Sequence, residues 1–205
     1  MPKVTEAHSA GRREQIINAA YLCFARKGFH QTTMRDIYEE AKLSPGAVYH
    51  YFDSKDAIIQ ASFELDYQRS LSIFDAASAS DDPLQALHEL IDFFFQGLES
   101  AAALGAGRVN VQGWSEALVN PTLHATIQRV LQQYLDILAQ LVRRAQDTRQ
   151  LDPSFDPRTI GRMLLSLYYG LELQKALDSE LEIAPYAAAI KALLLSASRP
   201  NERTG

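Results

Sequence analysis

The sequence predicts an all-α protein of nine helices, with three short helices at the N-terminus and six in a larger C-terminal body. The 205 residues are 47% hydrophobic and rich in Ala and Leu, with only 10 glycines and 8 prolines. This composition favours helices and permits a sizeable core. Apolar residues also recur with a helical period through most of the chain, and no segment alternates cleanly as a strand does.

The three N-terminal helices are delimited by residues that commonly start or stop a helix. The first helical pattern begins near residue 11 and ends at Gly28, which is well placed to stop it. Thr32 or Thr33 can cap the second helix. Ser44 can cap the third, and Pro45 then takes its first position, where a missing N–H costs nothing. These signals predict two short helices joined by a tight turn.

Six further helices follow, and turn or capping residues separate them. Ser54 can cap the fourth helix, and Asp81-Asp82-Pro83 can open the fifth. The predicted ranges are roughly 54–79, 83–104, 109–118, 121–150, 156–177 and 185–197. We therefore predict two domains, a helix-turn-helix domain at 1–55 and a helical body at 56–205.

The third helix is suited to entering a DNA groove. Its first residues are small, so its backbone can approach base edges, and the free N–H groups of a helix N-terminus favour phosphate oxygens. Val48 and Phe52 take the buried side, which leaves the polar tips of the intervening aromatic residues for phosphates. A helix-turn-helix is also an ordinary way to pack helices, so a purely structural role stays open. The candidate DNA contacts are Thr33, Ser44, Pro45, Gly46, Ala47, Tyr49, His50, Tyr51 and Lys55.

The charge distribution has the sign expected for a DNA-binding head. The net charge is −5, but residues 1–55 carry 8 Lys and Arg against 6 Asp and Glu. Residues 56–205 carry 12 against 19. The asymmetry is modest and places the positive charge in the head.

The segment from Arg12 to Ile59 resembles the N-terminal domain of the TetR family of bacterial transcriptional regulators. The matching pieces are IINAAYLCFARKGFHQTT, IYEEAKLSPGAVYHYF and SKDAI. The resemblance implies a homodimer, a palindromic operator and a C-terminal ligand-binding domain, usually in a repressor that its ligand releases. By position, it implies DNA contacts at Thr33, Ser44, Gly46, Tyr49, His50, Tyr51 and Lys55.

The chain departs from the family pattern at Lys42, where the turn commonly has a glycine. A residue other than glycine can hold a positive φ at a cost of roughly 1 kcal/mol. The fold is therefore compatible with Lys42, and its ammonium group becomes a further candidate phosphate contact.

The body contains the residue types of a small-molecule site. Three consecutive phenylalanines on one helix, 93–95, cannot all face one core, and an apolar pocket with a few polar groups is the usual ligand site. Most aromatic residues of a helical bundle are simply core, so that alternative stays open. The candidate effector-binding residues are Phe94, Asn110, Trp114, Glu116, Tyr168 and Glu172.

The eighth and ninth helices are apolar over more than one stripe, so both must be buried. Either they pair with a second copy of the chain, or they form an internal hairpin. Small residues permit close helix approach, which favours a homodimer. The candidate interface residues are Gly161, Leu164, Leu167, Gly170, Leu171 and Leu194.

The sequence gives little support to an enzyme, because the five histidines are scattered and no glycine-rich phosphate loop is found. We expect no metal and no cofactor. Cys23 is the single cysteine, the N-terminus is polar, and no apolar run approaches the ~20 residues of a membrane span. We therefore expect a cytoplasmic protein without membrane contact.

The leading prediction is a ligand-responsive DNA-binding regulator, a repressor released from a palindromic operator by a small apolar or aromatic molecule. Its partners would be double-stranded DNA, the effector and a second copy of itself. The alternative is a helical DNA-binding protein of chromosome organisation without ligand-controlled transcription.

Overall fold

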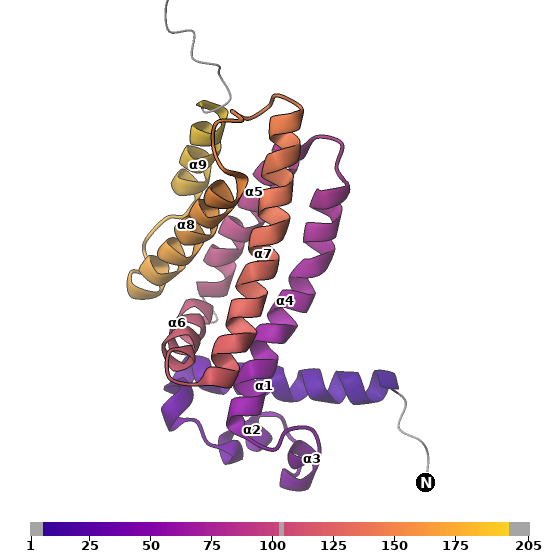
Figure 1. Cartoon of the computed structure of the whole chain (residues 1–205). Coiled ribbons are helices and arrows are strands. Elements are labelled where there is room, and N and C mark those ends of the chain that lie inside the picture. Colours follow the sequence, from indigo (N-terminus) through magenta and orange to yellow (C-terminus); the bar gives the residue numbers. More distant parts are fainter. Residues whose placement is uncertain (1–5, 103–104, 197–205) are drawn as a thin grey trace, which may run out of the picture. The chain divides into compact units, whose positions relative to one another are not determined.

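The computed structural model describes residues 6–102 and 105–196, and these residues form nine helices and no strand (Figure 1). The all-α class and the predicted helix count are therefore confirmed over this part of the chain. None of these helices is long and apolar enough to cross a membrane. The helices are α1 (Glu6–Gln31), α2 (Met34–Glu40), α3 (Pro45–Tyr49), α4 (Lys55–Ala79), α5 (Pro83–Ala102), α6 (Ala106–Ala117), α7 (Pro121–Asp147), α8 (Pro157–Leu177) and α9 (Ala184–Ser196).

Several helices begin where the sequence predicts because their caps are local. Ser44, Ser54 and Asp156 each accept a hydrogen bond from the backbone N–H three residues later, at 3.2, 3.1 and 2.8 Å. Pro45 and Pro157 take the first helical positions of α3 and α8. These starts follow from the residues beside them.

The predicted ends of α4 at residue 79 and of α8 at residue 177 are confirmed, and some other helix ends differ by a few residues. Helix α1 extends further towards the N-terminus than the expected start near residue 11, and α6 begins before residue 109. The predicted ends of α5 at Leu104 and of α9 at Ala197 lie outside the described residues.

Helix α1 leaves regular helical geometry at Gly28, whose φ is 79° and ψ is 168°. This φ lies in the region that glycine adopts at low cost. The backbone N–H and the hydroxyl of Thr32 both donate to the Gly28 carbonyl, at 3.2 and 2.7 Å. The predicted stop is confirmed, and the chain turns there towards α2.

The chain divides into two compact units. The first comprises residues up to 67 together with 104–128, and the second comprises 68–103 together with residues from 129 onwards. Helices α4 and α7 contribute residues to both units. The predicted domain boundary at residue 55 coincides with the start of α4, and it stays a prediction.

The first unit has its own core, formed where α1, α2 and α3 meet. Phe24, Ile37 and Val48 are completely buried, and Phe24 packs edge-to-face on Phe29 with 4.8 Å between ring centroids. Helix α6 belongs to this unit and packs against α1. The sequence placed α6 in the body and gave no sign of this contact.

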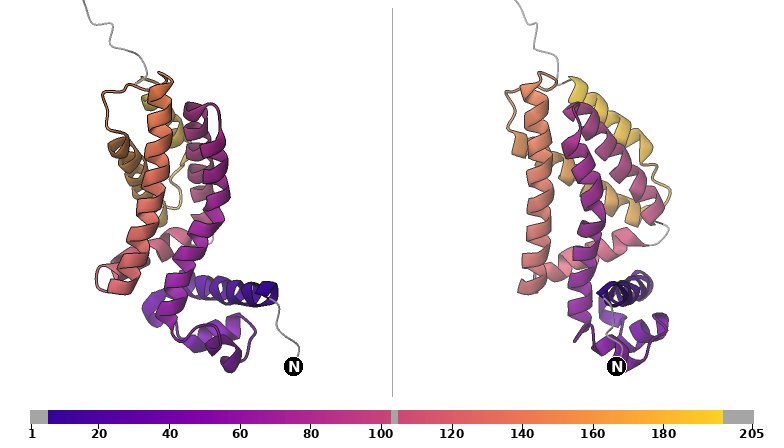
Figure 2. Two further views of the ribbon diagram at one scale, coloured as in Figure 1. Left: turned by 45° about the vertical axis from the view of Figure 1, so that its right-hand side comes forward. Right: turned by 90° about the vertical axis from the view of Figure 1, so that its right-hand side faces the viewer.

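The second unit has a separate core of apolar residues from α4, α5, α7, α8 and α9. Figure 2 shows α9 alongside α5, and the two helices are in contact. The three phenylalanines of α5 divide as predicted. Phe95 is buried, Phe94 is half-buried against the core, and Phe93 is 50% exposed.

Candidate nucleic-acid interface

Helix α3 presents its N-terminal residues openly. Ser44, Pro45 and Gly46 are exposed and Ala47 is half-buried. A Cβ atom added at Gly46 would meet no other atom within 4 Å. The start of α3 is therefore narrow and uncovered within the first unit, which is the geometry that close approach to base edges needs.

The aromatic residues at the end of α3 lie on the exposed side, as expected from the buried Val48. Tyr49 is 48% exposed and His50 is exposed. Tyr51 is half-buried, and its ring packs edge-to-face against His50 with 5.0 Å between centroids. These side chains present a phenol and an imidazole that can hydrogen-bond phosphate oxygens.

The turn between α2 and α3 contains the strained residue that the sequence predicts. Lys42 has a φ of 54° and its side chain is exposed. Gln15 of α1 donates its amide N–H to the carbonyl of Ala41 at 2.8 Å, and this hydrogen bond anchors the turn to α1. The Lys42 ammonium group is therefore carried on an anchored turn next to the start of α3.

Two predicted phosphate contacts have other partners in the structure. The Lys55 ammonium donates to the carbonyls of Phe29 and Thr32, the latter at 3.0 Å. Thr33 caps α2, because its hydroxyl accepts from the N–H of Asp36 at 3.2 Å and donates to the Asp36 carboxylate at 2.8 Å. The first roles of Lys55 and Thr33 are therefore structural, and their contact with DNA stays a proposal.

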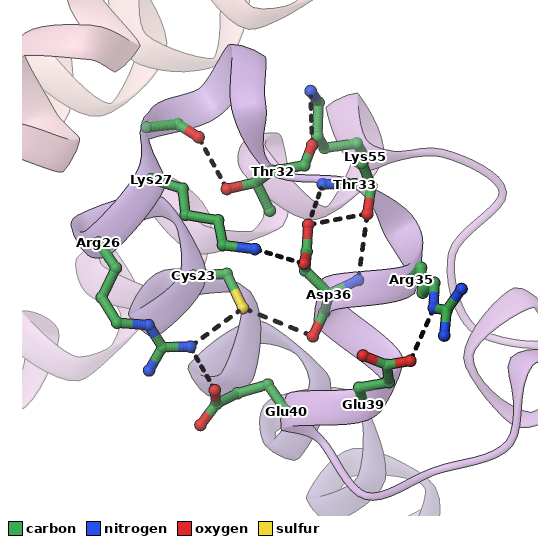
Figure 3. Close-up of polar contacts among 11 residues, drawn as sticks. Cys23, Arg26, Lys27, Thr32, Thr33, Arg35, Asp36, Glu39, Glu40 and Lys55 are labelled. Atoms are coloured by element: carbon green, nitrogen blue, oxygen red, sulfur yellow. Dashed lines mark hydrogen bonds and ion pairs between the residues drawn. The ribbon is translucent and has the colours of Figure 1, made fainter.

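Three basic residues of the head are ion-paired with carboxylates of α2 (Figure 3). Lys27 binds Asp36 at 2.6 Å and Arg35 binds Glu39 at 2.7 Å. Arg26 pairs with Glu40. Part of the positive charge of residues 1–55 is thus neutralised on α2, which leaves Lys42 as an exposed cation beside α3.

A contact that the sequence did not reveal joins α1 to Phe52, which follows α3. The guanidinium of Arg13 lies 4.5 Å from the ring centroid of Phe52. A cation over an aromatic face is stabilised by roughly 0.5–1 kcal/mol at an exposed site. Arginine and phenylalanine 39 positions apart carry no local signal, so only the fold brings them together.

The second unit contains an aromatic cluster formed by Phe74, Phe94, Tyr134 and Tyr168. Phe74 lies 5.2 Å from Phe94 and 5.1 Å from Tyr134, and Phe94 lies 6.0 Å from Tyr168, all between ring centroids. Glu172 is a carboxylate that is only 3% exposed.

Polar side chains border the aromatic cluster. The Tyr134 hydroxyl is 3.0 Å from Ser70 Oγ. Desolvation raises the pKa of the Tyr169 phenol, with Tyr134 and Glu172 as further causes, so this phenol stays a hydrogen-bond donor. Of the predicted effector-binding residues, Phe94 and Tyr168 therefore pack together in the second unit, and Glu172 lies about one helical turn after Tyr168 on α8. Asn110, Trp114 and Glu116 lie on α6, in the first unit.

The predicted interface residues of α8 and α9 divide into two groups. Leu164, Leu171 and Leu194 are buried in the core of their own chain. Gly161 is also buried, because a Cβ there would lie 3.2 Å from both Leu135 and Leu138 of α7. Leu167 is exposed, and a Cβ at Gly170 would meet nothing within 4 Å. Gly161, Leu164, Leu171 and Leu194 are therefore buried within their own chain, whereas Leu167 and Gly170 lie on an exposed face of α8, and the interface stays a prediction.

Metal and thiol chemistry find little support in the described part of the chain. Among those residues, no three His, Cys, Asp or Glu side chains are grouped to hold a metal ion. Cys23 is buried, and burial raises the pKa of its thiol. A protonated, buried thiol is a poor nucleophile, which fits a structural role.

An exposed, capped helix-turn-helix joined to a helical body defines a class of DNA-binding regulators, and comparison with known proteins gives the family. The profile described as "Bacterial regulatory proteins, tetR family" matches residues 16–62, and the profile "BetI-type transcriptional repressor, C-terminal" matches residues 83–197. The chain therefore belongs to the TetR family of transcriptional regulators, with a C-terminal domain of the BetI repressor type. The family is made up of DNA-binding regulators rather than enzymes.

Individual relatives agree with this assignment. The transcriptional regulator UidR of Escherichia coli K12 is 29% identical over 184 residues, which cover 89% of this chain and 90% of UidR. The structure of Salmonella enterica GusR has a TM-score of 0.72 at 25% identity, and the match covers 95% of this chain and 98% of GusR. FadR of Bacillus subtilis, solved in complex with stearoyl-CoA, has a TM-score of 0.74 at 20% identity, with 90% and 98% covered. The chain is a DNA-binding transcriptional regulator.

The contacts of Asp36 predict a pH-dependent contribution to stability. The Lys27 ammonium and the hydrogen bonds from Thr33 hold the pKa of the Asp36 carboxyl well below its ordinary value of 3.8. A depressed folded pKa means that the charged carboxylate stabilises the fold fully above pH 3.8, and that this contribution is lost as the pH falls below that value. Asp36→Asn should therefore unfold at a lower urea concentration than the wild type at pH 7, and the gap should close below pH 3.8.

Glu39→Gln is the matched control, because Glu39 is also a carboxylate of α2 that pairs with a basic side chain, Arg35, but it is more exposed than Asp36. Exposed pairs contribute little, so this variant should follow the wild type across the pH range. A gap for Asp36→Asn that stays constant from pH 7 to pH 3 would contradict the assignment.

Proposed function

We propose that this regulator is a repressor that binds a palindromic operator as a homodimer and leaves it when a small apolar or aromatic molecule binds. The observation that carries the proposal is the uncovered, small-residue start of α3 at residues 44–47 beside the exposed Lys42. Its place of action is the cytoplasm, where the DNA is.

On DNA, the first turn of α3 would approach the base edges of a major groove. Tyr49, His50 and Tyr51 would contact phosphates from the exposed side, and Lys42 would add a charge contact from the turn. Lys55 and Thr33 already make hydrogen bonds within the head. They would contact DNA phosphates only with the hydrogen-bonding groups that these bonds do not use. In this assignment the phosphate contacts set the register of the helix and the small residues of α3 face the bases.

The dimer surface would be formed by exposed apolar residues of α8 and α9. On α8 it comprises Met163, Leu167, Gly170, Leu173 and Leu177, which recur at helical spacing, and on α9 it comprises Tyr186 and Leu193. Leu177 is 81% exposed and Leu193 is 67% exposed. Large apolar side chains gathered on two adjacent helices are typical of a protein–protein interface. A two-fold dimer then explains a palindromic operator.

The effector would bind at the aromatic cluster of the second unit. Aromatic rings with a few polar groups are the usual lining of a small-molecule site. The Glu172 carboxylate and the Tyr169 phenol would orient a ligand that offers hydrogen bonds. The FadR structure holds stearoyl-CoA, which supports the view that this fold accommodates a largely apolar effector.

Replacing Lys42 should change the salt dependence of DNA binding. The probe is a duplex that the wild-type chain enriches from a random library, with binding followed by fluorescence anisotropy at several salt concentrations. Each phosphate contact contributes roughly 0.9 to the slope of log K against log salt. Lys42→Gln should therefore flatten the slope by about one contact and weaken all sequences alike. Tyr49→Phe should weaken binding without changing the sequence preference.

Arg158→Gln is the control for charge, because it removes one cation from α8 of the second unit, where Arg158 pairs with Asp136. It should leave the slope unchanged. If Lys42→Gln and Tyr49→Phe both bind as the wild type does, the proposed docking of α3 is wrong.

A charge among the exposed apolar residues of α8 and α9 should break the dimer. Leu193→Glu would bury a carboxylate without a partner in the interface, which costs several kcal/mol. We expect a monomer by light scattering that keeps its helical circular dichroism and loses specific binding to the duplex. Leu118→Glu is the matched control, because Leu118 is 82% exposed but lies outside α8 and α9. A dimer that survives Leu193→Glu would move the interface elsewhere.

The effector site can be tested with two neighbouring phenylalanines of α5. A panel of aromatic compounds and long-chain acyl-CoAs is screened for release of the protein from the enriched duplex. Phe94→Ala should then raise the concentration for half-release about fivefold, because it removes aromatic contacts of the order of 1 kcal/mol. Phe93→Ala, at the exposed neighbouring position, should not. Equal responses of the two variants would exclude the cluster as the site.

A further inference from the structure

The peptide group of Phe29 is held from two sides in the first unit. Its N–H donates to Oε1 of Gln112 on α6 at 2.7 Å. Its carbonyl accepts from the Lys55 ammonium at the start of α4. The same ammonium donates to the Thr32 carbonyl at 3.0 Å. One residue of the turn after α1 therefore joins α6 to the residue that begins α4.

The Gln112 side chain fits this position closely. Its Nε2 donates to the Arg108 carbonyl at 3.0 Å, which directs the amide oxygen towards Phe29. A Cβ atom at Gly28 would lie 2.7 Å from Gln112 Oε1, a distance that real side chains do not allow. A side chain at position 28 would therefore displace the Gln112 amide from Phe29, besides straining the backbone at its positive φ.

Helix α6 also touches α4 in this unit. A Cβ at Gly113 would lie 2.0 Å from the ring of Phe63, so the backbone of α6 rests on that ring. Gly113 is buried. Residue 112 of α6 therefore forms a hydrogen bond with the turn after α1, while residue 113 packs against α4.

The contact between α6 and the turn after α1 joins parts of the chain that match two different family profiles. Helix α6 falls within residues 83–197, which match the C-terminal repressor domain. It nevertheless belongs to the compact unit that contains α1, α2 and α3. A segment of the C-terminal domain is therefore bonded to the turn that positions α2 and Lys55.

We propose that Gln112 is a positioning residue for DNA binding, which acts through the Phe29 peptide group on Lys55 and on the turn that leads into α2. When α6 holds the Phe29 N–H, the Phe29 carbonyl stays in place to accept from Lys55, and the head keeps the geometry that binds DNA. When α6 releases Phe29, Lys55 and the start of α2 lose that support. This inference rests on the proposed function, because it assumes that the head binds DNA as described above.

Coupling of this kind is reciprocal. If the position of α6 changes the affinity for DNA, DNA binding must favour the arrangement of α6 in which the Phe29 hydrogen bond is formed. In the wild-type chain, binding of the enriched duplex should slow hydrogen exchange of the amides in residues 29–32. Unchanged exchange of this segment on DNA binding would overturn the proposal without the use of any variant.

Two substitutions at residue 112 separate the hydrogen bond from packing. Gln112→Met keeps a side chain of similar length and removes the acceptor, whereas Gln112→Glu keeps an acceptor for the Phe29 N–H. We expect Gln112→Met to bind the duplex about fivefold more weakly, the order of effect of one lost hydrogen bond. Gln112→Glu should bind more tightly than Gln112→Met but less tightly than the wild type, because it keeps the acceptor for Phe29 and loses the donor to the Arg108 carbonyl. Gln128→Met, the same change at an exposed glutamine of α7 in the same unit, is the control.

A double-mutant cycle then tests the route through Lys55. In a Lys55→Met background, Gln112→Met should have little further effect, because the group that it positions is gone. In a Lys42→Gln background, the fivefold loss should persist, since Lys42 has no part in the contact with Phe29. If Gln112→Met only loosened the first unit in general, its effect on DNA affinity would be the same in the Lys55→Met and the Lys42→Gln backgrounds.

The outcomes distinguish this proposal from the function on which it rests. A wild-type chain that enriches no duplex overturns the proposed function, and the role of Gln112 with it. A wild-type chain that binds its duplex while Gln112→Met binds equally well overturns the role of Gln112 alone. A fivefold loss that is the same in the Lys55→Met background removes Lys55 from the route.

Discussion

The head depends on how α1 ends. A helix C-terminus leaves carbonyl groups without intrahelical partners, and these must be satisfied by other groups. Here Gly28 turns the chain at a φ of 79°, Thr32 donates back to the Gly28 carbonyl, and Lys55 takes the carbonyls of Phe29 and Thr32. Helices α2 and α3 follow directly from this turn. The turn at Gly28 and the hydrogen bonds around it therefore set the direction in which the chain enters α2 and α3, and the core of Phe24, Ile37 and Val48 holds the three helices together.

Features that depend on neighbouring residues could be predicted from the sequence. The cap of α3 at Ser44, the cap of α8 at Asp156 and the stop at Gly28 each depend on residues within one helical turn. The contacts of Lys55 and Gln112 with Phe29 span 26 and 83 positions. Lysine and glutamine are ordinary surface residues in a sequence, so nothing in the pattern marks them as partners of a helix end.

The same limit applies to the proposed surfaces. Periodicity shows that α8 carries more than one apolar stripe, but it does not show which stripe faces the core of its own chain. Gly161 and Gly170 look alike in sequence, yet one lies against Leu135 and Leu138 and the other faces open space. A glycine allows another helix to approach closely, but its small size does not show whether that helix belongs to the same chain or to a second copy. Likewise, aromatic composition pointed to Phe94 and Tyr168 and also to Trp114, which lies on a helix of the first unit.

Lys42 has a consequence for how this head can change. Its φ of 54° carries a cost that glycine would avoid. A glycine would relieve the backbone and at the same time remove the exposed ammonium beside α3. Stability and attraction to a phosphate backbone therefore make opposite demands on this one position, and no natural side chain meets both. Strain at a binding surface is commonly retained where the group that it carries is useful. Under the proposed phosphate contact, Lys42→Gly would thus make the head more robust and at the same time a weaker ligand for DNA.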